Sequence, residues 1–494
     1  MTDWSRGYVA GNTYGIAWQA AQTPAHLAMV CAMAGIAWQP RERMHVADLG
    51  CGRGYTVNTL AAANPDWTVL GLDHSPAHVA EGMQTAARAG LGNALFVEAD
   101  LATMSDAELD RIPPLDVAML HGVWSWVSDE VRAGILRLLS RRLKPGGIAY
   151  FGYNALPASS GDLALQRLLR HLAGPVDSQP GQAAAAATTA MTRLRAMAGS
   201  FALRDTPMLR RLLAEPPVLE PAFVAHEFLT SHWRPVFHAD LCESVGAAKL
   251  EFVGSCNLFE ALPGLVCDAE QLGVMGHLPE GTPREFLKDL CLPRSFRADL
   301  FIRGARRTNP AAAMDALLLA ACAPLPEEAP ILTTGTGRAS LPQPAWEAVA
   351  ACLAEGPQPL GRLCSLVPGD TLHPAEVLAL LVGTDLVLPV FRPSVRAAAA
   401  TRFNLAAAAI HAPGGEGSGH FALASPVAAG GLPATALDLA LVAALLEGAD
   451  PEDPQALAER LQPELNDEGL ARAADIIAGR WAERIPIWRL FGVI

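Results

Sequence analysis

The chain is poor in charged and aromatic residues. Only 18% of its 494 residues are charged and 6% are aromatic, whereas 51% are hydrophobic. So much apolar material supplies large buried cores and excludes wholesale disorder. Basic residues are also scarce, because 37 lysines and arginines face 50 acidic residues and the net charge is −13. A surface of this sign repels phosphate backbones, so we predict no nucleic-acid partner and expect attraction to a basic one, such as a lysine-bearing protein.

The sequence also lacks paired cysteines and long apolar runs. Its nine cysteines include no Cys-x-x-Cys pair, which excludes a zinc ribbon and a disulfide framework, and no metal-ligand spacing is visible. The longest apolar stretches, 311–322 and 436–446, contain Asp315 and Asp438 and fall short of the roughly 20 residues that a spanning helix needs. The N-terminal residues show no signal-peptide pattern. We therefore expect a reduced, cytoplasmic protein without membrane insertion.

Short apolar runs alternate with helical patterns over the first 155 residues. This alternation predicts a doubly wound, Rossmann-like α/β sheet. The alternation of strand and helix patterns returns near residue 250. We therefore expect two late strands to complete a seven-stranded sheet after a helical insertion. The low-complexity segment at 181–190 within this insertion is either a linker or a plain alanine helix. The expected strands are 44–50, 68–73, 94–100, 115–121, 148–154, 251–258 and 298–306.

A different pattern begins near residue 309. Three short helical patterns at 346–355, 360–367 and 374–383 precede a strand-like segment at 385–391, which predicts a mixed α+β, winged-helix-like domain. Between residues 339 and 391 only Arg362 is basic, so we interpret this module as protein-facing rather than duplex-binding. A mostly helical region follows the glycine-rich loop at 414–419.

The most informative motif is VADLGCGRGY at 46–55. A strand followed by Gly50, Gly52 and Gly54 and then a helix lets backbone amides approach a ligand closely. Dinucleotide sites usually space their glycines G-x-G-x-x-G, whereas this motif is G-x-G-x-G preceded by Asp48, which favours an adenosyl cofactor without a pyrophosphate. The alternative is a glycine-rich turn that binds nothing.

Two further carboxylates follow the next two expected strands. Asp73 stands where an acid accepts hydrogen bonds from ribose hydroxyls, and Asp100 could meet an adenine amino group. Each alone could be a solvated cap at a strand end. Together with the glycine motif they place ligand-binding groups at the carboxyl ends of three consecutive strands, which predicts one crevice.

These motifs resemble a known family. The segments VADLGCGRG, GLDHS, VEADL and LKPGG are similar to the successive motifs of class I S-adenosylmethionine-dependent methyltransferases. Later segments resemble the subgroup that carries a methyltransferase regulatory domain, and this subgroup includes bacterial protein-lysine methyltransferases that modify outer-membrane proteins. The segments are HGVWSWV (121–127), YNALP (153–157), AHEFLTSHWRPV (225–236), FRADLFIRGAR (296–306) and LASPVAAGG (423–431).

The resemblance implies S-adenosylmethionine as the cofactor. The three glycines would wrap its methionine and ribose, Asp48 would face its amino-acid end and Asp73 its ribose. Asp100 with Leu101 would meet the adenine, and His121 would lie near the sulfonium. The residues expected to bind the cofactor are Asp48, Gly50, Cys51, Gly52, Gly54, Asp73, His74, Asp100, Leu101 and His121.

Methyl transfer to a lysine needs little chemistry from side chains beyond positioning and desolvation. The amine must be neutral, and deprotonating it near neutral pH costs about 4 kcal/mol, which an apolar channel with aromatic walls would reduce. We expect the catalytic residues to be Tyr153, His121 and Trp126, with Tyr153 and Asn154 binding the incoming amine where the fifth strand ends. Trp124 and Tyr14 are further candidates for the walls. The alternatives are that the tryptophans are packing residues and that His121 is a hydrogen-bonded structural group.

Other polar clusters are interpreted as structural. His226, Glu227, His232 and His238 have no metalloprotease spacing, so we expect packing under the sheet, with Glu227 capping a helix or pairing with an arginine. The C-terminal arginines are expected on a solvated helix face. They are Arg472, Arg480, Arg484 and Arg489.

The leading hypothesis is an S-adenosylmethionine-dependent methyltransferase acting on protein lysine. The alternatives are a small-molecule methyltransferase, a non-catalytic cofactor-binding regulator and, disfavoured by the glycine spacing, an NAD oxidoreductase. The oligomeric state is not determined and a homodimer stays open. The predicted domains are the cofactor-binding core (1–155), the helical insertion or regulatory domain (156–231), the remainder of the sheet (232–308), the winged-helix-like domain (309–395) and a mainly helical region (396–494).

Overall fold

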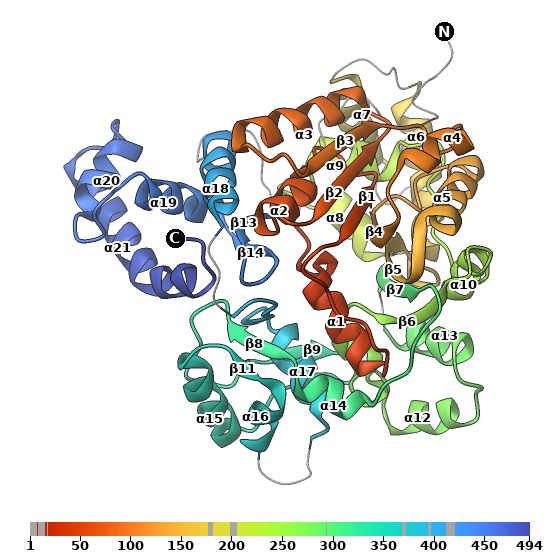
Figure 1. The fold of residues 1–494 in the computed structure, drawn as a ribbon. Helices are drawn as coiled ribbons and strands as arrows, with labels where there is room; N and C mark the ends of the chain where they lie inside the picture. The colour runs from red at the N-terminus through yellow and green to blue at the C-terminus, as the bar shows by residue number, and fades with distance from the viewer. Residues whose placement is uncertain are drawn as a thin grey trace.

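A seven-stranded sheet forms the centre of the molecule (Figure 1). The structure is a computed structural model that describes residues 7, 15–16, 18–175, 181–197, 205–292, 294–367, 372–393, 397–411 and 420–494. The strand order is β3-β2-β1-β4-β5-β7-β6, and only β7 runs antiparallel to its neighbours. The strands are β1 (His45–Leu49), β2 (Thr68–Asp73), β3 (Ala94–Glu98), β4 (Leu115–His121), β5 (Leu143–Asn154), β6 (Glu251–Ser255) and β7 (Phe296–Ile302).

This sheet confirms the predicted fold class, including the two late strands. One local difference is the segment LKPGG at 143–147, which was expected as a turn before the fifth strand. It belongs to β5, with a register irregularity against β4 and with Gly146 at a φ of 77°. The chain crosses from β3 back to β4, beside β1, so the order of strands reverses between β1 and β4. Ligands of open α/β sheets bind outside the carboxyl ends of the strands at such a point.

Helices cover both faces of the sheet, because successive strand side chains alternate between them. On one face Val46 and Val117 join a core with α1 (Pro24–Met33), α2 (Tyr55–Ala63) and α3 (Pro76–Ala89). On the other face Ala47 and Ala118 pack with α4 (Asp106–Arg111), α5 (Asp129–Arg142) and α10 (His238–Gly246). A 3-10 turn, η1 (Ala20–Gln22), leads into α1.

The insertion after β5 is helical and has its own core. It begins with η2 (Ala158–Gly161) and continues through α6 (Asp162–Ala173), α7 (Gln182–Ala196), α8 (Pro207–Leu213) and α9 (Pro221–Phe228). The alanine-rich segment forms part of α7, with Ala183, Ala187 and Ala190 buried on one face of the helix. Of the two alternatives left by the sequence, the helix is therefore correct. Trp126 of the cofactor-binding core packs into the same cluster, which ties the insertion to the sheet.

A second insertion, between β6 and β7, contains a buried ionic network. Its elements are η3 (Leu258–Ala261), α11 (Pro263–Val266), α12 (Ala269–Gly276) and α13 (Thr282–Cys291). Arg297 of β7 is 0% exposed and forms ion pairs with Asp289 at 2.8 Å, with Asp299 at 2.9 Å and with Glu285 at 3.1 Å. Arg294 also pairs with Asp289 and extends the network to Glu260. Such a network packs α13 firmly against the sheet only while every charge has its partner.

The segment after β7 has the helices expected of a winged-helix-like module. After α14 (Pro310–Asp315), the helices α15 (Gln343–Ala354), α16 (Leu360–Ser365) and α17 (Pro374–Gly383) match the three predicted patterns. A three-stranded sheet of order β11-β8-β12 joins them, and its central strand lies in an apolar stretch that was not predicted as a strand. Its strands are β8 (Leu318–Ala321), β11 (Gln358–Pro359) and β12 (Val387–Pro389), with a separate hairpin of β9 (Leu332–Thr334) and β10 (Gly337–Ala339).

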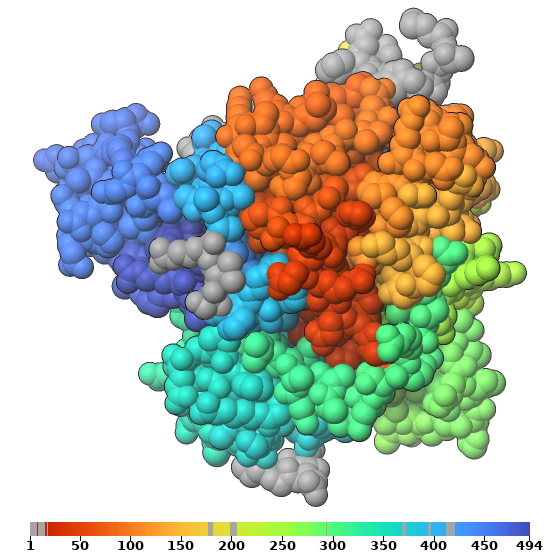
Figure 2. Space-filling view, in the orientation of Figure 1, coloured from red at the N-terminus to blue at the C-terminus, as the bar shows by residue number. Residues whose placement is uncertain are grey.

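The C-terminal region packs against the cofactor-binding core. Figure 2 shows its helices in blue along one flank of the molecule. Helix α18 (Ala398–His411) contacts α2 and α3, and the Tyr55 hydroxyl donates to the Ala422 carbonyl at 2.7 Å. The remaining elements are β13 (Phe421–Ser425), β14 (Gly430–Ala434), α19 (Ala436–Leu446), α20 (Pro454–Leu461) and α21 (Asp467–Leu490). The glycine-rich loop at 414–419 lies outside the described residues.

The prediction of a solvated arginine face on the last helix is wrong for two of its residues. Arg484 is 4% exposed and donates to the Cys322 carbonyl at 2.8 Å, so it joins α21 to the preceding module. Arg480 pairs with the buried Asp438 at 2.8 Å. Both arginines complete polar contacts between elements that are distant in sequence. Among the described helices, none combines the length and the apolar character needed to cross a membrane.

Candidate active site

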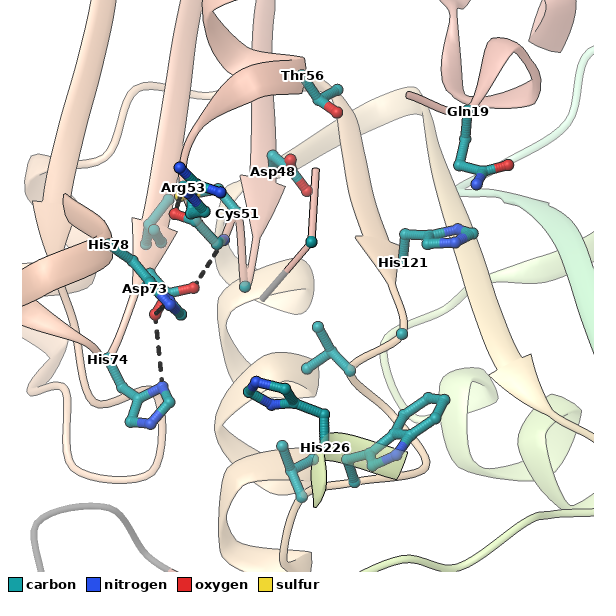
Figure 3. A pocket seen from close by; sticks show the side chains of 18 of the residues that line it. Gln19, Asp48, Cys51, Arg53, Thr56, Asp73, His74, His78, His121 and His226 are labelled. Carbon is teal, nitrogen blue, oxygen red and sulfur yellow. Dashed lines mark hydrogen bonds and ion pairs between the residues drawn. The ribbon is translucent and has the colours of Figure 1, made fainter. Parts of the chain in front are cut away.

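A cavity of about 470 Å³ opens at the carboxyl ends of the parallel strands, beside the point where the strand order reverses. A volume of this size suits a small-molecule cofactor. Figure 3 shows Asp73 and His121 on opposite sides of the cavity, with His226 projecting from a third direction. The structure brings to it all the expected cofactor-binding residues except Gly54. Those that line it are Asp48, Gly50, Cys51, Gly52, Asp73, His74, Asp100, Leu101 and His121.

The glycine turn between β1 and α2 divides into a ligand-facing part and a packing part. Gly52 has a φ of 51°, and a side chain there would meet no protein atom within 4 Å, so its open side faces the cavity. Gly54 has a φ of 76°, and a Cβ there would overlap the ring of Phe96 on β3. We expected Gly54 to wrap the cofactor. Instead it does not line the cavity, and its lack of a side chain lets α2 approach β3.

Asp73 is held rigidly at the end of β2. It is 7% exposed and accepts hydrogen bonds from the backbone N–H groups of Gly52 at 2.8 Å and Ser75 at 2.9 Å. Burial would raise the pKa of Asp73, but hydrogen bonding and charge from His78, the Ser75 amide and the charge of His74 lower it below its ordinary value. The carboxylate is therefore ionised at neutral pH and suited to accept hydrogen bonds from a ribose.

Asp48, the fourth residue of β1, is a buried carboxylate, and no cation in the described part of the chain forms an ion pair with it. It lines the cavity and is 5% exposed. Burial, followed by the negative charge of Asp73, raises the pKa of Asp48 to about 7. A ligand ammonium would supply the missing positive charge, which fits the amino-acid end of S-adenosylmethionine.

His121 faces the cavity from the end of β4. Its Nδ1 lies 2.9 Å from the Tyr150 hydroxyl, and its ring packs 5.1 Å from that of Phe296. Burial lowers the pKa of His121 to about 4, so the imidazole is neutral at pH 7. A neutral ring beside the expected sulfonium position avoids repulsion between two cations.

Beyond the cofactor-binding residues the cavity continues into a recess formed partly by the helical insertion. Its walls combine apolar and aromatic side chains with the polar residues Ser128, Asn154, His226, Glu227 and Ser295. Trp126 contributes to the walls as predicted, whereas Trp124 is 2% exposed and packs in the core under α5. Tyr14 lies outside the described residues. The apolar members are Trp126, Val127, Val131, Met208, Phe223 and Phe296.

Tyr153 does not reach this recess, which corrects our expectation that it binds the acceptor. It is 0% exposed, belongs to the core on the face covered by α5 and α10, and donates its hydroxyl hydrogen bond to Asp299 at 2.5 Å. The reason is strand geometry, because neighbours in a strand point to opposite faces and only Asn154 lines the cavity. The period of the strand could have revealed this from the sequence.

Family comparisons agree with this geometry. A family model described as a methyltransferase domain matches residues 47–149, and one described as a predicted methyltransferase regulatory domain matches residues 220–303. The chain is an S-adenosylmethionine-dependent methyltransferase. The first match spans β1 through β5, and the second spans α9 and the two late strands. These matches set the NAD oxidoreductase alternative aside.

Whole-chain similarity extends to a solved structure. PKMT2 from Rickettsia typhi, also solved in complex with AdoHcy, superimposes with a TM-score of 0.69 at 16% identity, over 97% of this chain and 100% of that one. An uncharacterised Synechocystis protein is 25% identical over 400 residues, which are 80% of this chain and 78% of its own. A trans-aconitate 2-methyltransferase of Methylobacterium nodulans is 35% identical over 151 residues, only 30% of this chain and 50% of that enzyme.

The methyltransferase contains site residues that sequence reasoning missed. Glu227 was expected to cap a helix or pair with an arginine, yet it lines the recess and accepts hydrogen bonds from Asn154 and Trp233. His226, beside it on α9, also lines the cavity. Gln19 and Gln22 reach the cavity from the N-terminal segment. No local pattern marks these residues, because they come from two segments that lie about 200 positions apart in the chain.

Replacing Asp48 with asparagine is expected to flatten the pH dependence of cofactor binding. In the wild-type methyltransferase, the ligand ammonium requires the ionised carboxylate, whose pKa in the free protein is about 7. Affinity should therefore be constant above about pH 8 and fall roughly tenfold per unit below pH 7. D48N should bind more weakly at pH 8 and show no such slope between pH 5.5 and 8.5. Calorimetry with S-adenosylhomocysteine at several pH values checks this, and an equal slope in both proteins would contradict it.

Replacing Tyr153 with phenylalanine distinguishes the structural position from the one expected from sequence. The variant loses a hydrogen bond to a buried carboxylate, so its apparent free energy of unfolding should fall by about 1–3 kcal/mol. Its affinity for S-adenosylhomocysteine should stay within about twofold of the wild type. Urea denaturation and calorimetry measure the two quantities. Unchanged stability with slower methyl transfer would instead place the phenol at the acceptor.

Proposed function

We propose that this methyltransferase N-methylates lysine side chains of a protein substrate. The observation that carries the proposal is the apolar recess that continues from the cofactor-binding residues. Trp126, Phe223 and Phe296 line it, so a long aliphatic side chain could enter while water is excluded. Phe223 is 37% exposed, so this part of the wall is accessible from solvent, which is compatible with a macromolecular acceptor.

The recess suits an amine acceptor for a physical reason. A lysine must lose its proton before it can react, and an apolar surrounding lowers the pKa of an amine by disfavouring its charged form. Aromatic walls also tolerate the cationic methylated product. S-adenosylmethionine, when bound, would supply an electrophilic methyl group on a sulfonium for transfer to the lone pair of a neutral amine. The protein's part is to hold the amine in line and dry.

Two further observations support a protein as the acceptor. PKMT2 of Rickettsia typhi shares the fold over 97% of this chain, so the likeness takes in the insertions and the C-terminal region as well as the cofactor-binding core. The net charge of −13 favours encounter with basic, lysine-bearing surfaces. We further propose that the C-terminal modules recruit this partner, in keeping with the single basic residue between residues 339 and 391.

The direct test is incubation of the purified chain with S-adenosylmethionine labelled in the methyl group and with lysate proteins. We expect label in protein that is recovered as N-methyllysine after acid hydrolysis. Label only in the low-mass fraction would overturn the protein acceptor, and no label in any fraction would favour a cofactor-binding regulator.

A small-molecule acceptor is the second candidate. It is favoured by the trans-aconitate 2-methyltransferases, which are 35% identical over 151 residues. Their similarity covers 30% of this chain and 50% of their own length, so most of the insertions and C-terminal modules lie outside it. Transfer of label to trans-aconitate, with none to protein, would support this candidate.

A further inference from the structure

Glu227 is an ionisable group in the recess and has no basic partner among the residues that the structure describes. It lies in the last turn of α9 and lines the cavity. Its Oε1 accepts hydrogen bonds from Asn154 Nδ2 at 2.8 Å and from Trp233 Nε1 at 3.3 Å. Both donors are neutral, and among the described residues no lysine, arginine or histidine forms an ion pair with this carboxylate. The charged group acting on it is Asp162, which is also negative.

Asn154 is held in place beside this carboxylate. Its backbone N–H donates to Ser125 Oγ at 2.8 Å, and its carbonyl accepts from the Val236 N–H at 3.0 Å. The side chain lines the cavity and the residue is 7% exposed, yet its Oδ1 has no hydrogen-bond partner among the described residues. A buried amide oxygen without a partner is costly, unless a ligand donates to it.

We propose that Glu227 and Asn154 form a binding site for the ammonium group of the acceptor. The inference rests on the proposed lysine acceptor and deepens it by assigning the residues that recognise the nitrogen. An ammonium has three N–H donors and a positive charge. One donor satisfies Asn154 Oδ1, another satisfies the open oxygen of Glu227, and the charge compensates a carboxylate that the protein leaves uncompensated.

The same arrangement selects against other acceptor classes. A carboxylate acceptor would bring a third negative charge close to Glu227 and Asp162 and would offer Asn154 Oδ1 no donor. A neutral hydroxyl could donate one hydrogen bond but would not compensate the charge. The site therefore distinguishes a cationic amine from the acid that the trans-aconitate enzymes methylate.

Glu227 also provides a destination for the acceptor's proton. Burial raises the pKa of Glu227 above its ordinary value, although the hydrogen bonds from Asn154 and Trp233 oppose this effect. The step moves one proton from the ammonium nitrogen to Glu227 Oε2, which leaves a neutral amine with a free lone pair and a neutral carboxylic acid. The proton passes to solvent when the product leaves, which restores the carboxylate.

The test uses a simple amine, so that it does not require the natural substrate. The full chain, saturated with S-adenosylhomocysteine, is titrated with n-pentylammonium, 1-pentanol and pentanoate and followed by ligand-observed NMR. We expect wild type to bind the ammonium more tightly than the alcohol and to bind pentanoate least. In Glu227→Gln the ammonium affinity should fall at least tenfold, while alcohol affinity stays within twofold. Asn154→Ala should lose severalfold.

Controls separate recognition from folding. Asp162→Asn removes a nearby negative charge that does not line the cavity, so its ammonium affinity should stay within about threefold. Glu227→Gln should keep its S-adenosylhomocysteine affinity and should not lower the melting temperature, because it removes an uncompensated buried charge. A Glu227 with a purely structural role would instead destabilise the protein when replaced and leave amine binding unchanged.

The outcomes distinguish this inference from the proposed function. If lysate proteins are methylated but Glu227→Gln binds the ammonium and transfers methyl as wild type does, the ammonium site is wrong and the lysine function stands. If the ammonium binds in a Glu227-dependent manner but no protein is labelled, the site stands and the protein acceptor is wrong. Equal affinity of the wild type for all three probes overturns the site.

Discussion

Replacing Asp73 with alanine is expected to weaken cofactor binding by about 100-fold or more. The carboxylate is ionised and aimed into the cavity, so it would accept two charge-assisted hydrogen bonds from the ribose hydroxyls. Such bonds contribute about 1.5–3 kcal/mol each. Its removal also frees the backbone N–H groups of Gly52 and Ser75, which hold the glycine turn in shape. Calorimetric titration with S-adenosylhomocysteine measures the loss.

The matched control is Glu98→Ala. Glu98 ends the neighbouring strand β3, is exposed and does not line the cavity, so its removal should leave the affinity within about twofold. Asp73→Asn, which keeps one acceptor oxygen, should fall between alanine and wild type. If Asp73→Ala binds the cofactor as tightly as Glu98→Ala does, the ribose site has been misplaced.

Replacing Arg297 with methionine is expected to destabilise the protein by about 3–5 kcal/mol. Arg297 is 0% exposed, and its loss leaves Asp299 buried without its arginine partner and Asp289 with Arg294 alone. Burial would raise the pKa of Asp299, but the charge of Arg297 lowers it well below its ordinary value, which shows how strongly the two groups depend on each other. Urea denaturation at pH 7.5 should report a lower apparent free energy of unfolding.

An exposed arginine provides the comparison. Arg210 is 64% exposed in its pair with Asp205, so Arg210→Met should change the free energy of unfolding by less than about 0.5 kcal/mol. Because Asp299 in the R297M variant would regain protons as the pH falls, the deficit of R297M should shrink at acidic pH. A deficit that is equally small in both variants would mean that the network contributes little to stability.

Much of the cofactor-binding part of the site could be predicted from the sequence, because the motifs that mark it are local. The glycines follow β1, Asp73 ends β2 and Asp100 follows β3, and parallel strands bring their carboxyl ends to one edge. The same strand periodicity puts Tyr153 and Asn154 of β5 on opposite faces of the sheet, so only one of them can reach the cavity, and in the structure it is Asn154.

The recess proposed to bind the acceptor could not be predicted in this way, because the residues that form it share no periodicity in the sequence. Glu227 lies 73 residues after Asn154, on a helix of an insertion, and only the packing of that insertion on the sheet brings their side chains to 2.8 Å. The same holds for Arg484, whose guanidinium donates a hydrogen bond to the backbone carbonyl of Cys322, 162 positions earlier in the chain. No rule of spacing anticipates such partners.

The sequence by itself therefore determined the elements that local patterning encodes: the strand and helix order, the parallel sheet, and the cofactor residues at strand ends. The tertiary structure alone decided which buried polar side chains contact one another. It therefore decided whether a given carboxylate has a cationic partner. The physical reason is that periodicity and turn chemistry act within a few residues. Desolvation and hydrogen bonding depend on neighbours that only the folded chain supplies.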